Sequence, residues 1–238
     1  MSSYSILKVK DKTDSYYTKR FPFDLSFRLI IVGKSFLSGK STVILNLLLR
    51  DNFYKNSFDG ENIYIVSNNK MDNKMKILKT EKEIPDANFM DFSEQNLEAI
   101  YDKVEDECMD AVADNKKPVN ALIVLDDCAF GGGLKEKLNG TLARISCNGR
   151  HINLSMIVTS QKYTQLATVI RTNASGAILF GNSAKELDLM ADDLNYLESK
   201  KDFIKPFRQA TKGRNKFLCV SFSEDDLYLD SDFKPISL

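Results

Sequence analysis

The sequence predicts an α/β fold in which helices flank both faces of a mostly parallel central sheet. Short apolar runs alternate with helical patterns from residue 27 onward, which is typical of parallel strands joined by crossover helices. The first apolar run passes through a short polar loop into a helix that opens with Gly-Lys-Ser-Thr. A later run ends in two adjacent aspartates. Together these features predict a sheet with a phosphate-binding loop at one edge.

Strands are expected wherever apolar residues run together. In chain order the predicted strands are Phe27–Val32, Asn62–Val66, Ala121–Leu125, Leu154–Thr159, Ala177–Phe180 and a last one near Phe217–Ser221. The predicted helices are Lys40–Arg50, an amphipathic helix at Ser93–Asp114, Leu134–Cys147, a helix through Leu187, Met190 and Leu194, and a basic segment around residues 200–208.

Length and composition favour one folded unit. The chain has 238 residues with 43% hydrophobic content, which suits one sizeable core and is too short for two typical domains. We expect an N-terminal arm at residues 1–26, a core at 27–197 and a C-terminal extension packed on that core at 198–238.

Charge and cysteine content narrow the class further. Lys+Arg and Asp+Glu number 33 each, so any contact with nucleic acid must come from local patches. Four isolated cysteines and one histidine disfavour a zinc site and indicate reduced thiols inside a cell. No apolar run approaches the length of a membrane span and no signal-peptide core is present, so we expect a soluble intracellular protein with no membrane partner.

The segment Ile30–Thr42 has the pattern of a P-loop, because an apolar strand leads through a loop into Ser-Gly-Lys-Ser-Thr at the start of a helix. Such a loop wraps a polyphosphate with backbone N–H groups at the positive end of the helix. Lys40 would reach the β- and γ-phosphates, and the Ser41 hydroxyl would ligate Mg²⁺. Ser38, Gly39 and Thr42 complete the predicted binding set for a nucleoside triphosphate.

The loop is one residue longer than the usual pattern of Gly, four residues and Gly-Lys-Ser/Thr. Its first glycine is Gly33, whereas the standard spacing would put that glycine at position 34, where the chain has Lys34. Either the extra residue bulges away from the phosphates or Lys34 occupies the usual glycine position.

Two further motifs come after the P-loop. Asp126 and Asp127 follow the strand at 121–125, as in a Walker B motif, so Asp126 is the predicted magnesium ligand and Asp127 the predicted general base. Gln161 follows the next strand. It would point at the γ-phosphate if its strand lies between the P-loop strand and the Walker B strand.

Three arginines are candidates for an arginine finger, which a neighbouring subunit usually delivers to the γ-phosphate. Arg144 and Arg150 precede the strand of Gln161, and Arg171 precedes the strand at 177–180. We favour Arg150 and keep Arg144 and Arg171 as alternatives, because each arginine could instead form a structural ion pair.

Residues 69–72 read Asn-Lys-Met-Asp and match the guanine-recognition motif of GTPases. In GTPases this motif follows the Walker B region, whereas here it precedes that region. No Asp-x-x-Gly follows the third strand either, so we interpret the match as chance.

The order of these motifs resembles that of FtsK/HerA-type, additional-strand (RecA/FtsK-like) P-loop ATPases, and most closely that of the DNA-packaging ATPases of poxviruses, other large DNA viruses and virophages. The resemblance rests on residues 39–42, the Asp126-Asp127 pair, Gly149-Arg150-His151, Ser160-Gln161 and Arg171-Thr172-Asn173. It implies a homo-oligomeric ring that hydrolyses ATP and moves double-stranded DNA, without reading its sequence, into a viral capsid through a capsid or portal component. It also implies action in the host-cell cytoplasm or virus factory, or in association with the virion.

DNA-facing positions would be basic. The candidates are Lys135, Lys137, Lys200, Lys201, Lys205, Arg208, Lys212 and Arg214, each of which could equally be an ordinary solvated side chain. Two alternative functions remain open at this point. One is a P-loop nucleoside or nucleotide kinase, and the other is a nucleotide-binding structural ring subunit.

Overall fold

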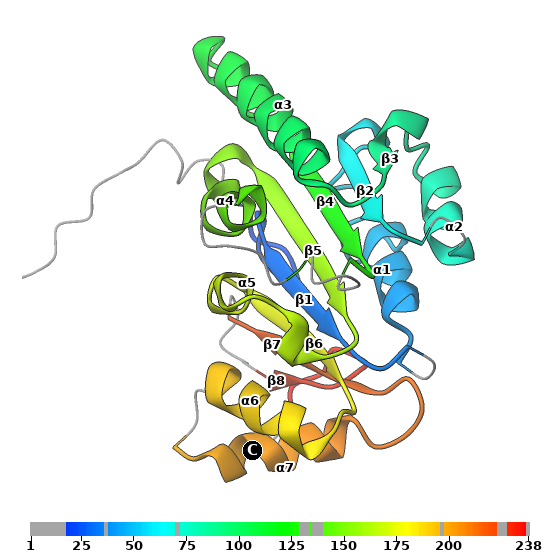
Figure 1. Ribbon diagram of the computed structural model, residues 1–238, viewed down its shortest axis with the longest axis vertical. Helices are drawn as coiled ribbons and strands as arrows, with labels where there is room; N and C mark the ends of the chain where they lie inside the picture. The colour runs from blue at the N-terminus through cyan, green and yellow to red at the C-terminus, as the bar shows by residue number, and fades with distance from the viewer. Residues whose placement is uncertain are drawn as a thin grey trace, which may run out of the picture.

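The computed structural model describes residues 18–35, 38–69, 72–128, 134, 140–195, 198–222 and 228–236. The strands form one eight-stranded sheet in the order β3-β2-β4-β5-β1-β6-β7-β8 (Figure 1). All pairs from β3 to β6 are parallel, whereas β7 and β8 join antiparallel at one side. The strands are β1 (Arg28–Val32), β2 (Ile63–Ser67), β3 (Phe89–Met90), β4 (Ala121–Asp126), β5 (Leu154–Ser160), β6 (Gly176–Phe180), β7 (Phe217–Ser221) and β8 (Tyr228–Leu229).

The helices occupy most of the predicted positions. They are α1 (Lys40–Leu49), α2 (Asn73–Glu81), α3 (Glu94–Ala113), α4 (Thr141–Asn148), α5 (Thr168–Thr172), α6 (Ala184–Leu194) and α7 (Lys200–Ala210), with short 3-10 turns at Gly60–Asn62, Asp86–Asn88, Gly149–Ile152 and Tyr163–Gln165. The described part of the predicted helix at 134–147 starts at Thr141, and residues 135–139 lie outside the described residues. The helices α2 and α5 and the strands β3 and β8 were not predicted from the sequence, because they are short or polar.

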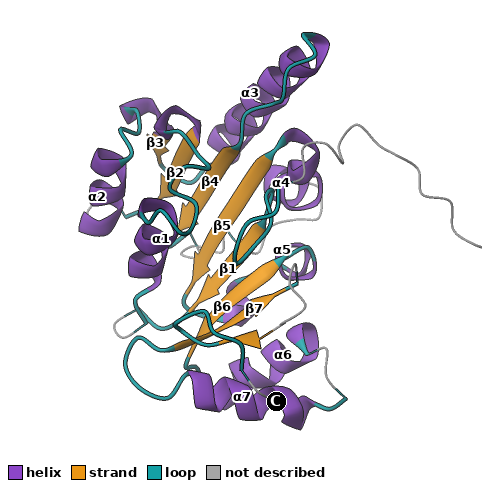
Figure 2. Cartoon of the chain, turned by 180° about the vertical axis from the view of Figure 1, so that it is seen from behind, coloured by secondary structure: helices purple, strands orange, loops and turns teal. Residues whose placement is uncertain are grey.

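Two apolar layers cover the two faces of the sheet, and helices lie on both sides (Figure 2). Ile30 and Val32 of β1 point into the layer that α3, α4, α6 and α7 cover. Leu29 and Ile31 point into the opposite layer, formed with α1, α2 and the segment before β1. Because side chains alternate along a strand, burial on both faces explains why the strands are continuous apolar runs.

Polar residues at the helix starts fix where several helices begin. Asp72 caps α2 by accepting hydrogen bonds from the N–H groups of Lys74 and Met75, and Ser93 caps α3 by accepting from Asn96 N–H. Ser183 caps α6, and Ser199 forms a capping box with Asp202 at α7. Each cap satisfies backbone donors that have no partner inside the helix.

The segment before β1 and the strand β7 are tied together. Phe23 is fully buried and lies so close to Gly176 of β6 that a methyl group at that position would collide with its ring. The Ser221 hydroxyl of β7 donates a hydrogen bond to the Pro22 carbonyl at 2.6 Å. The chain before β1 therefore belongs to the packed core from residue 22 onward.

The strand order sets the position of the predicted motifs. The strand β5 lies between β1 and β4, with Val32 beside Ser160 and Leu125 beside Val158. The carboxyl ends of β1, β5 and β4 therefore meet at one edge of the sheet, toward the start of α1 (Figure 1). This arrangement confirms the predicted mostly parallel α/β sheet. Among the described residues, no helix has both the length and the apolar character needed to span a bilayer.

Candidate nucleotide-binding site

Lys40 is held inside the loop between β1 and α1. It is 8% exposed, and its ammonium group donates a hydrogen bond to the Gly33 carbonyl at 2.7 Å. Burial lowers the pKa of Lys40, and the negative charges of Asp127 and Asp126 partly oppose that shift. The lysine and both predicted acids therefore lie within electrostatic range of one another, although they come from different strands and loops.

Gly33 occupies the tightly packed position at the end of β1. A methyl group there would lie 2.5 Å from Ser38 Cβ and 2.8 Å from Phe180 Cβ, which no side chain could tolerate. Lys34 is exposed, and its carbonyl accepts a hydrogen bond from the Ser38 hydroxyl at 2.7 Å. The close packing therefore requires glycine at position 33, while residues 36 and 37 of the loop lie outside the described residues.

Gly39 forms the start of α1 with a left-handed backbone, at φ 79° and ψ 23°. This conformation costs little for glycine and more for other residues. Asn215, in the turn between α7 and β7, lies against this position, because its Oδ1 atom would be 3.5 Å from a methyl group on Gly39. The C-terminal part of the chain therefore contacts the phosphate-binding loop.

Asp126 is the last residue of β4 and is 4% exposed. Its Oδ1 accepts a hydrogen bond from the Thr159 hydroxyl at 2.8 Å, and the same Thr159 oxygen accepts one from Asp127 N–H at 3.0 Å. Burial raises the pKa of Asp126, the Thr159 hydrogen bond lowers it, and the neighbouring Asp72 and Asp127 raise it further. A nearly buried carboxylate beside other acids is suited to a cation or to a cationic partner.

Asp127 turns away from the strand with a left-handed backbone, at φ 55°. Gln161, which follows β5, donates from Nε2 to Asp127 Oδ1 at 3.4 Å. The structure therefore brings the predicted base and the predicted γ-phosphate sensor into contact. The condition set for Gln161 is met, since β5 lies between β1 and β4.

Asp72 is a site residue that the sequence analysis did not identify. Its Oδ2 accepts a hydrogen bond from the Ser41 hydroxyl at 3.2 Å, and the next residue of α1, Thr42, accepts one from Lys74 Nζ at 2.6 Å. Asp72 is the last residue of the Asn-Lys-Met-Asp segment, whose match to the guanine-recognition motif we interpret as chance. A better signal was the helix-capping pattern, an aspartate before a segment with Met75 and Leu78 at helical spacing.

The three candidate arginines lie at the other edge of the sheet, where the parallel strands begin. Arg144 pairs with Asp102 and Glu105, and Arg171 pairs with Asp193. Both also lie over tyrosine rings, with the Arg144 guanidinium carbon 4.1 Å from the Tyr101 centroid and that of Arg171 5.3 Å from the Tyr163 centroid.

Arg150 differs from these two. It is exposed and forms no ion pair with any described residue, and its Nε donates to His151 Nε2 at 3.3 Å. It is also close enough to Arg28, the first residue of β1, to help burial lower the pKa of that arginine. Arg150 thus lies near the amino end of the strand whose carboxyl end enters the P-loop.

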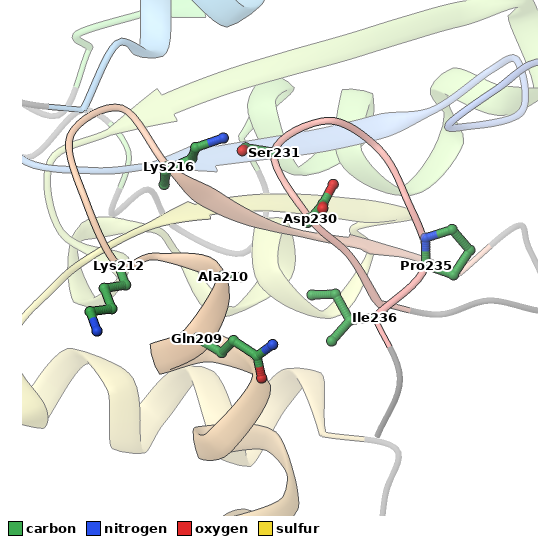
Figure 3. Close-up of a pocket in the computed structure, with 8 residues that line it drawn as sticks. All are labelled: Gln209, Ala210, Lys212, Lys216, Asp230, Ser231, Pro235 and Ile236. Atoms are coloured by element: carbon green, nitrogen blue, oxygen red, sulfur yellow. The ribbon is translucent and has the colours of Figure 1, made fainter.

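The basic positions of the C-terminal part are mostly on the surface. Lys201, Lys205, Arg208 and Arg214 are exposed, whereas Lys200 pairs with Asp188 and Asp192. Lys212 lines a cavity of about 410 Å³ between the end of α7, the following turn and the segment after β8 (Figure 3). Lys135 and Lys137 lie outside the described residues.

Comparisons with known proteins agree with the motif order. The family model described as "Poxvirus A32 protein" matches residues 17–234. The DNA-packaging ATPase B204 of Sulfolobus turreted icosahedral virus has a similar structure, with a TM-score of 0.57 and 14% identity over 90% of this chain and 99% of that chain. The genome packaging NTPase B204 of Sulfolobus turreted icosahedral virus 2, in complex with AMPPCP, gives 0.56 and 14% over 89% and 98%.

A bacterial structure extends this comparison. ATPases 2 and 3 of EssC from Geobacillus thermodenitrificans give a TM-score of 0.52 and 15% identity over 69% of this chain and 34% of that chain. At such identities the likeness concerns the fold, and it confirms the predicted additional-strand P-loop architecture. No curated protein matches the sequence.

Proposed function

Because this chain belongs to the poxvirus A32 protein family, we propose that it is an ATP-hydrolysing motor that moves double-stranded DNA into a viral capsid. The family match and the structural likeness to genome-packaging ATPases both support this function. The single observation that carries the proposal is the meeting of Lys40, Asp126, Asp127 and Gln161 at one edge of the sheet.

The loop around Gly39 would bind the triphosphate of ATP. Backbone N–H groups at the start of α1 would bind the phosphates, and Lys40 adds a positive charge at the first position of the same helix. The Ser41 hydroxyl and the Asp126 carboxylate are hard oxygen donors of the kind that Mg²⁺ prefers, so the residues present fit this ion. A bound Mg²⁺ would neutralise negative charge on the β- and γ-phosphates.

Asp127 and Gln161 would act on the attacking water. Asp127 is the proposed general base, because its carboxylate accepts a proton and it follows the metal-binding Asp126 directly. Gln161 donates a hydrogen bond to one oxygen of Asp127 and so orients the base. As the proposed sensor, Gln161 would also respond to the presence of the γ-phosphate.

The site would be completed by Arg150 of a neighbouring subunit. Arg150 lies at the opposite edge of the sheet from its own subunit's nucleotide site. It is exposed and has no acidic partner among the described residues. A subunit arranged in a ring could therefore offer this arginine to the next subunit's nucleotide. The exposed Lys201, Lys205 and Arg208 of α7 are the proposed contacts for the DNA backbone. The ring would act in infected cells, held at the capsid by a capsid or portal component.

ATP turnover measured with and without linear duplex DNA, over a range of protein concentrations, tests the proposed motor. We expect turnover per subunit to rise with duplex DNA and with protein concentration, because both favour assembly. A turnover that responds to neither would refute the motor. Phosphate transfer to a nucleoside or nucleotide, with little hydrolysis otherwise, would indicate a kinase instead.

A mixing experiment tests the shared site. Arg150→Ala subunits keep Asp127, and Asp127→Asn subunits keep Arg150, so a mixed ring contains some interfaces with both groups intact. We expect the mixture to regain activity that neither variant has alone. If the two variants assemble together but stay inactive, the arginine does not act across subunits.

A further inference from the structure

We propose that Asp72 is a positioning residue for the magnesium ion: it accepts the hydrogen of the Ser41 hydroxyl, so that the oxygen lone pairs of Ser41 face the cation. The inference deepens the proposed function and rests on its nucleotide site. It concerns a residue outside the P-loop and Walker B motifs, on the loop that follows β2.

The hydrogen-bond geometry gives the first step. A serine hydroxyl has one hydrogen to donate and two lone pairs to share. When the oxygen ligates a cation, a lone pair is used and the hydrogen must point to an acceptor elsewhere. Ser41 Oγ lies 3.2 Å from Asp72 Oδ2, which is such an acceptor.

The second step is that Asp72 is itself held in place. Its Oδ1 accepts hydrogen bonds from Lys74 N–H at 2.7 Å and from Met75 N–H at 3.4 Å, at the start of α2. One carboxylate oxygen therefore caps α2 while the other meets Ser41. In the proposed arrangement Asp72 acts on the ion through Ser41, from whose hydroxyl its Oδ2 accepts a hydrogen bond.

The third step is that α2 forms a fixed support beside α1. Met75 and Leu78 of α2 are fully buried in the same apolar layer as Ile44 and Leu47 of α1. Lys74 Nζ also donates to the Thr42 hydroxyl at 2.6 Å, next to Ser41. Ser41 and Thr42 in the first turn of α1 are thus hydrogen-bonded to Asp72 and Lys74 at the start of α2. Partners of this kind commonly tune metal affinity through the ligand that they orient.

The variant Asp72→Asn tests this role most directly. Its Oδ1 can still cap α2, because asparagine is as good a cap as aspartate. Its other atom becomes an N–H₂ donor, which reverses the hydrogen bond and occupies a lone pair of Ser41. The affinity for ATPγS is measured by calorimetry with excess Mg²⁺ and again with EDTA. The dissociation constant in EDTA divided by the dissociation constant with Mg²⁺ gives the contribution of magnesium.

We expect this ratio to fall about 10- to 100-fold in Asp72→Asn, as is typical when the partner of a metal ligand is lost. The affinity in EDTA and the melting temperature should stay close to those of the unchanged protein. Ser183→Ala is the matched control, since it removes the cap of α6, whose Ser183 side chain accepts from Glu186 N–H. It should lower the melting temperature without altering the ratio.

Three outcomes would overturn the inference. An unchanged ratio in Asp72→Asn, with a large ratio in the unchanged protein, would show that Asp72 only caps α2. An equal loss of affinity with Mg²⁺ and with EDTA would assign Asp72 to the loop as a whole. If magnesium has no effect on ATPγS binding by the unchanged protein, the proposed magnesium site fails together with this role. The first two outcomes differ from this one because in them the unchanged protein still binds ATPγS more tightly with Mg²⁺.

Discussion

The two edges of the parallel sheet carry opposite kinds of chemistry. At the carboxyl edge, the buried Asp126, the half-buried Asp127 and the buried Lys40 lie within electrostatic range, and Asp126 and Asp127 accept hydrogen bonds from Thr159 and Gln161. At the amino edge, Arg144 and Arg171 are paired with acids, whereas Arg150 is exposed with only His151 as a described partner. The contrast suggests that the carboxyl edge is prearranged within one subunit and that the amino edge offers one cation to another molecule.

The largest effect is expected at the amino edge. Arg150→Ala should lower the turnover number of assembled protein about 10³- to 10⁵-fold, which is the usual contribution of an arginine finger, and should leave ATPγS affinity nearly unchanged. Steady-state hydrolysis and calorimetry measure the two quantities. Lys116→Ala is the control, because it removes another exposed cation near the start of β4, one that pairs with the exposed Asp114. Full activity of Arg150→Ala would remove the functional contrast between the edges.

The next effect is expected at the carboxyl edge. Asp127→Asn should lower turnover about 10²- to 10⁴-fold, since it removes the proposed general base. Nucleotide affinity should survive, because Lys40 and Asp126 remain in place. Single-turnover hydrolysis of bound ATP separates the chemical step from binding. Loss of binding with no change in the rate of bound ATP would instead make Asp127 part of the phosphate-binding site.

The paired arginines should behave as structural residues. The Arg171 side chain is 13% exposed, and that of Arg144 is 42% exposed. Arg171→Ala should therefore lower the free energy of unfolding by about 2 kcal/mol, as for hydrogen bonds to charged groups. Arg144→Ala should lower it by less than about 1 kcal/mol, as for exposed ion pairs. Denaturant unfolding measures both, and the reverse order would contradict the assignment.

The smallest expected effect is a change in melting temperature at Asp126, where binding and stability should respond in opposite directions. Burial raises the pKa of Asp126, so its ionised form destabilises the folded protein at neutral pH. Asp126→Asn should abolish the magnesium contribution to nucleotide binding but raise the melting temperature. A gain of about 1 kcal/mol corresponds to about 2–4 °C for a chain of this size.

The pH dependence of this gain follows from the sign of the shift. The unfolded aspartate has a pKa of about 3.9, and the folded one lies above it. Below both values the carboxyl group is protonated in either state, so the two proteins should melt alike. As the pH rises above the unfolded pKa, the gain of Asp126→Asn should grow, and it should stay constant once the pH exceeds the folded pKa. A gain that persists at low pH would have a cause other than charge burial.

The comparison of the edges also shows which features the sequence could predict. The strands were predictable because burial on both faces makes them continuous apolar runs, and Lys40 and Asp126 follow from motifs tied to the ends of such runs. The helix α2 was missed because only Met75 and Leu78 of its nine residues are buried. The contact of Asp72 with Ser41 joins residues 31 apart and depends on the path of the chain after β2, which local patterns do not encode.

The pairing of the arginines was likewise beyond local patterns. Arg144 and Arg150 look equivalent in the sequence, but Arg144 faces α3, where Asp102 and Glu105 stand one turn apart. This pairing depends on how α3 and α4 pack side by side on one face of the sheet. Arg150 was a candidate from the sequence, but the fold was needed to show that, of the three arginines, it is the one without an ion pair to a described residue.

The link between Pro22, Ser221 and the ring of Phe23 against β6 bears on how the chain can be shortened. A fragment that stops at residue 197 would lose β7 and leave unpaired the main-chain N–H and C=O groups on the side of β6 that faces away from β1. Such an edge recruits strands from other molecules and promotes aggregation. Biochemical work on a minimal ATPase should therefore retain the polypeptide through residue 236, even if only the nucleotide chemistry is under study.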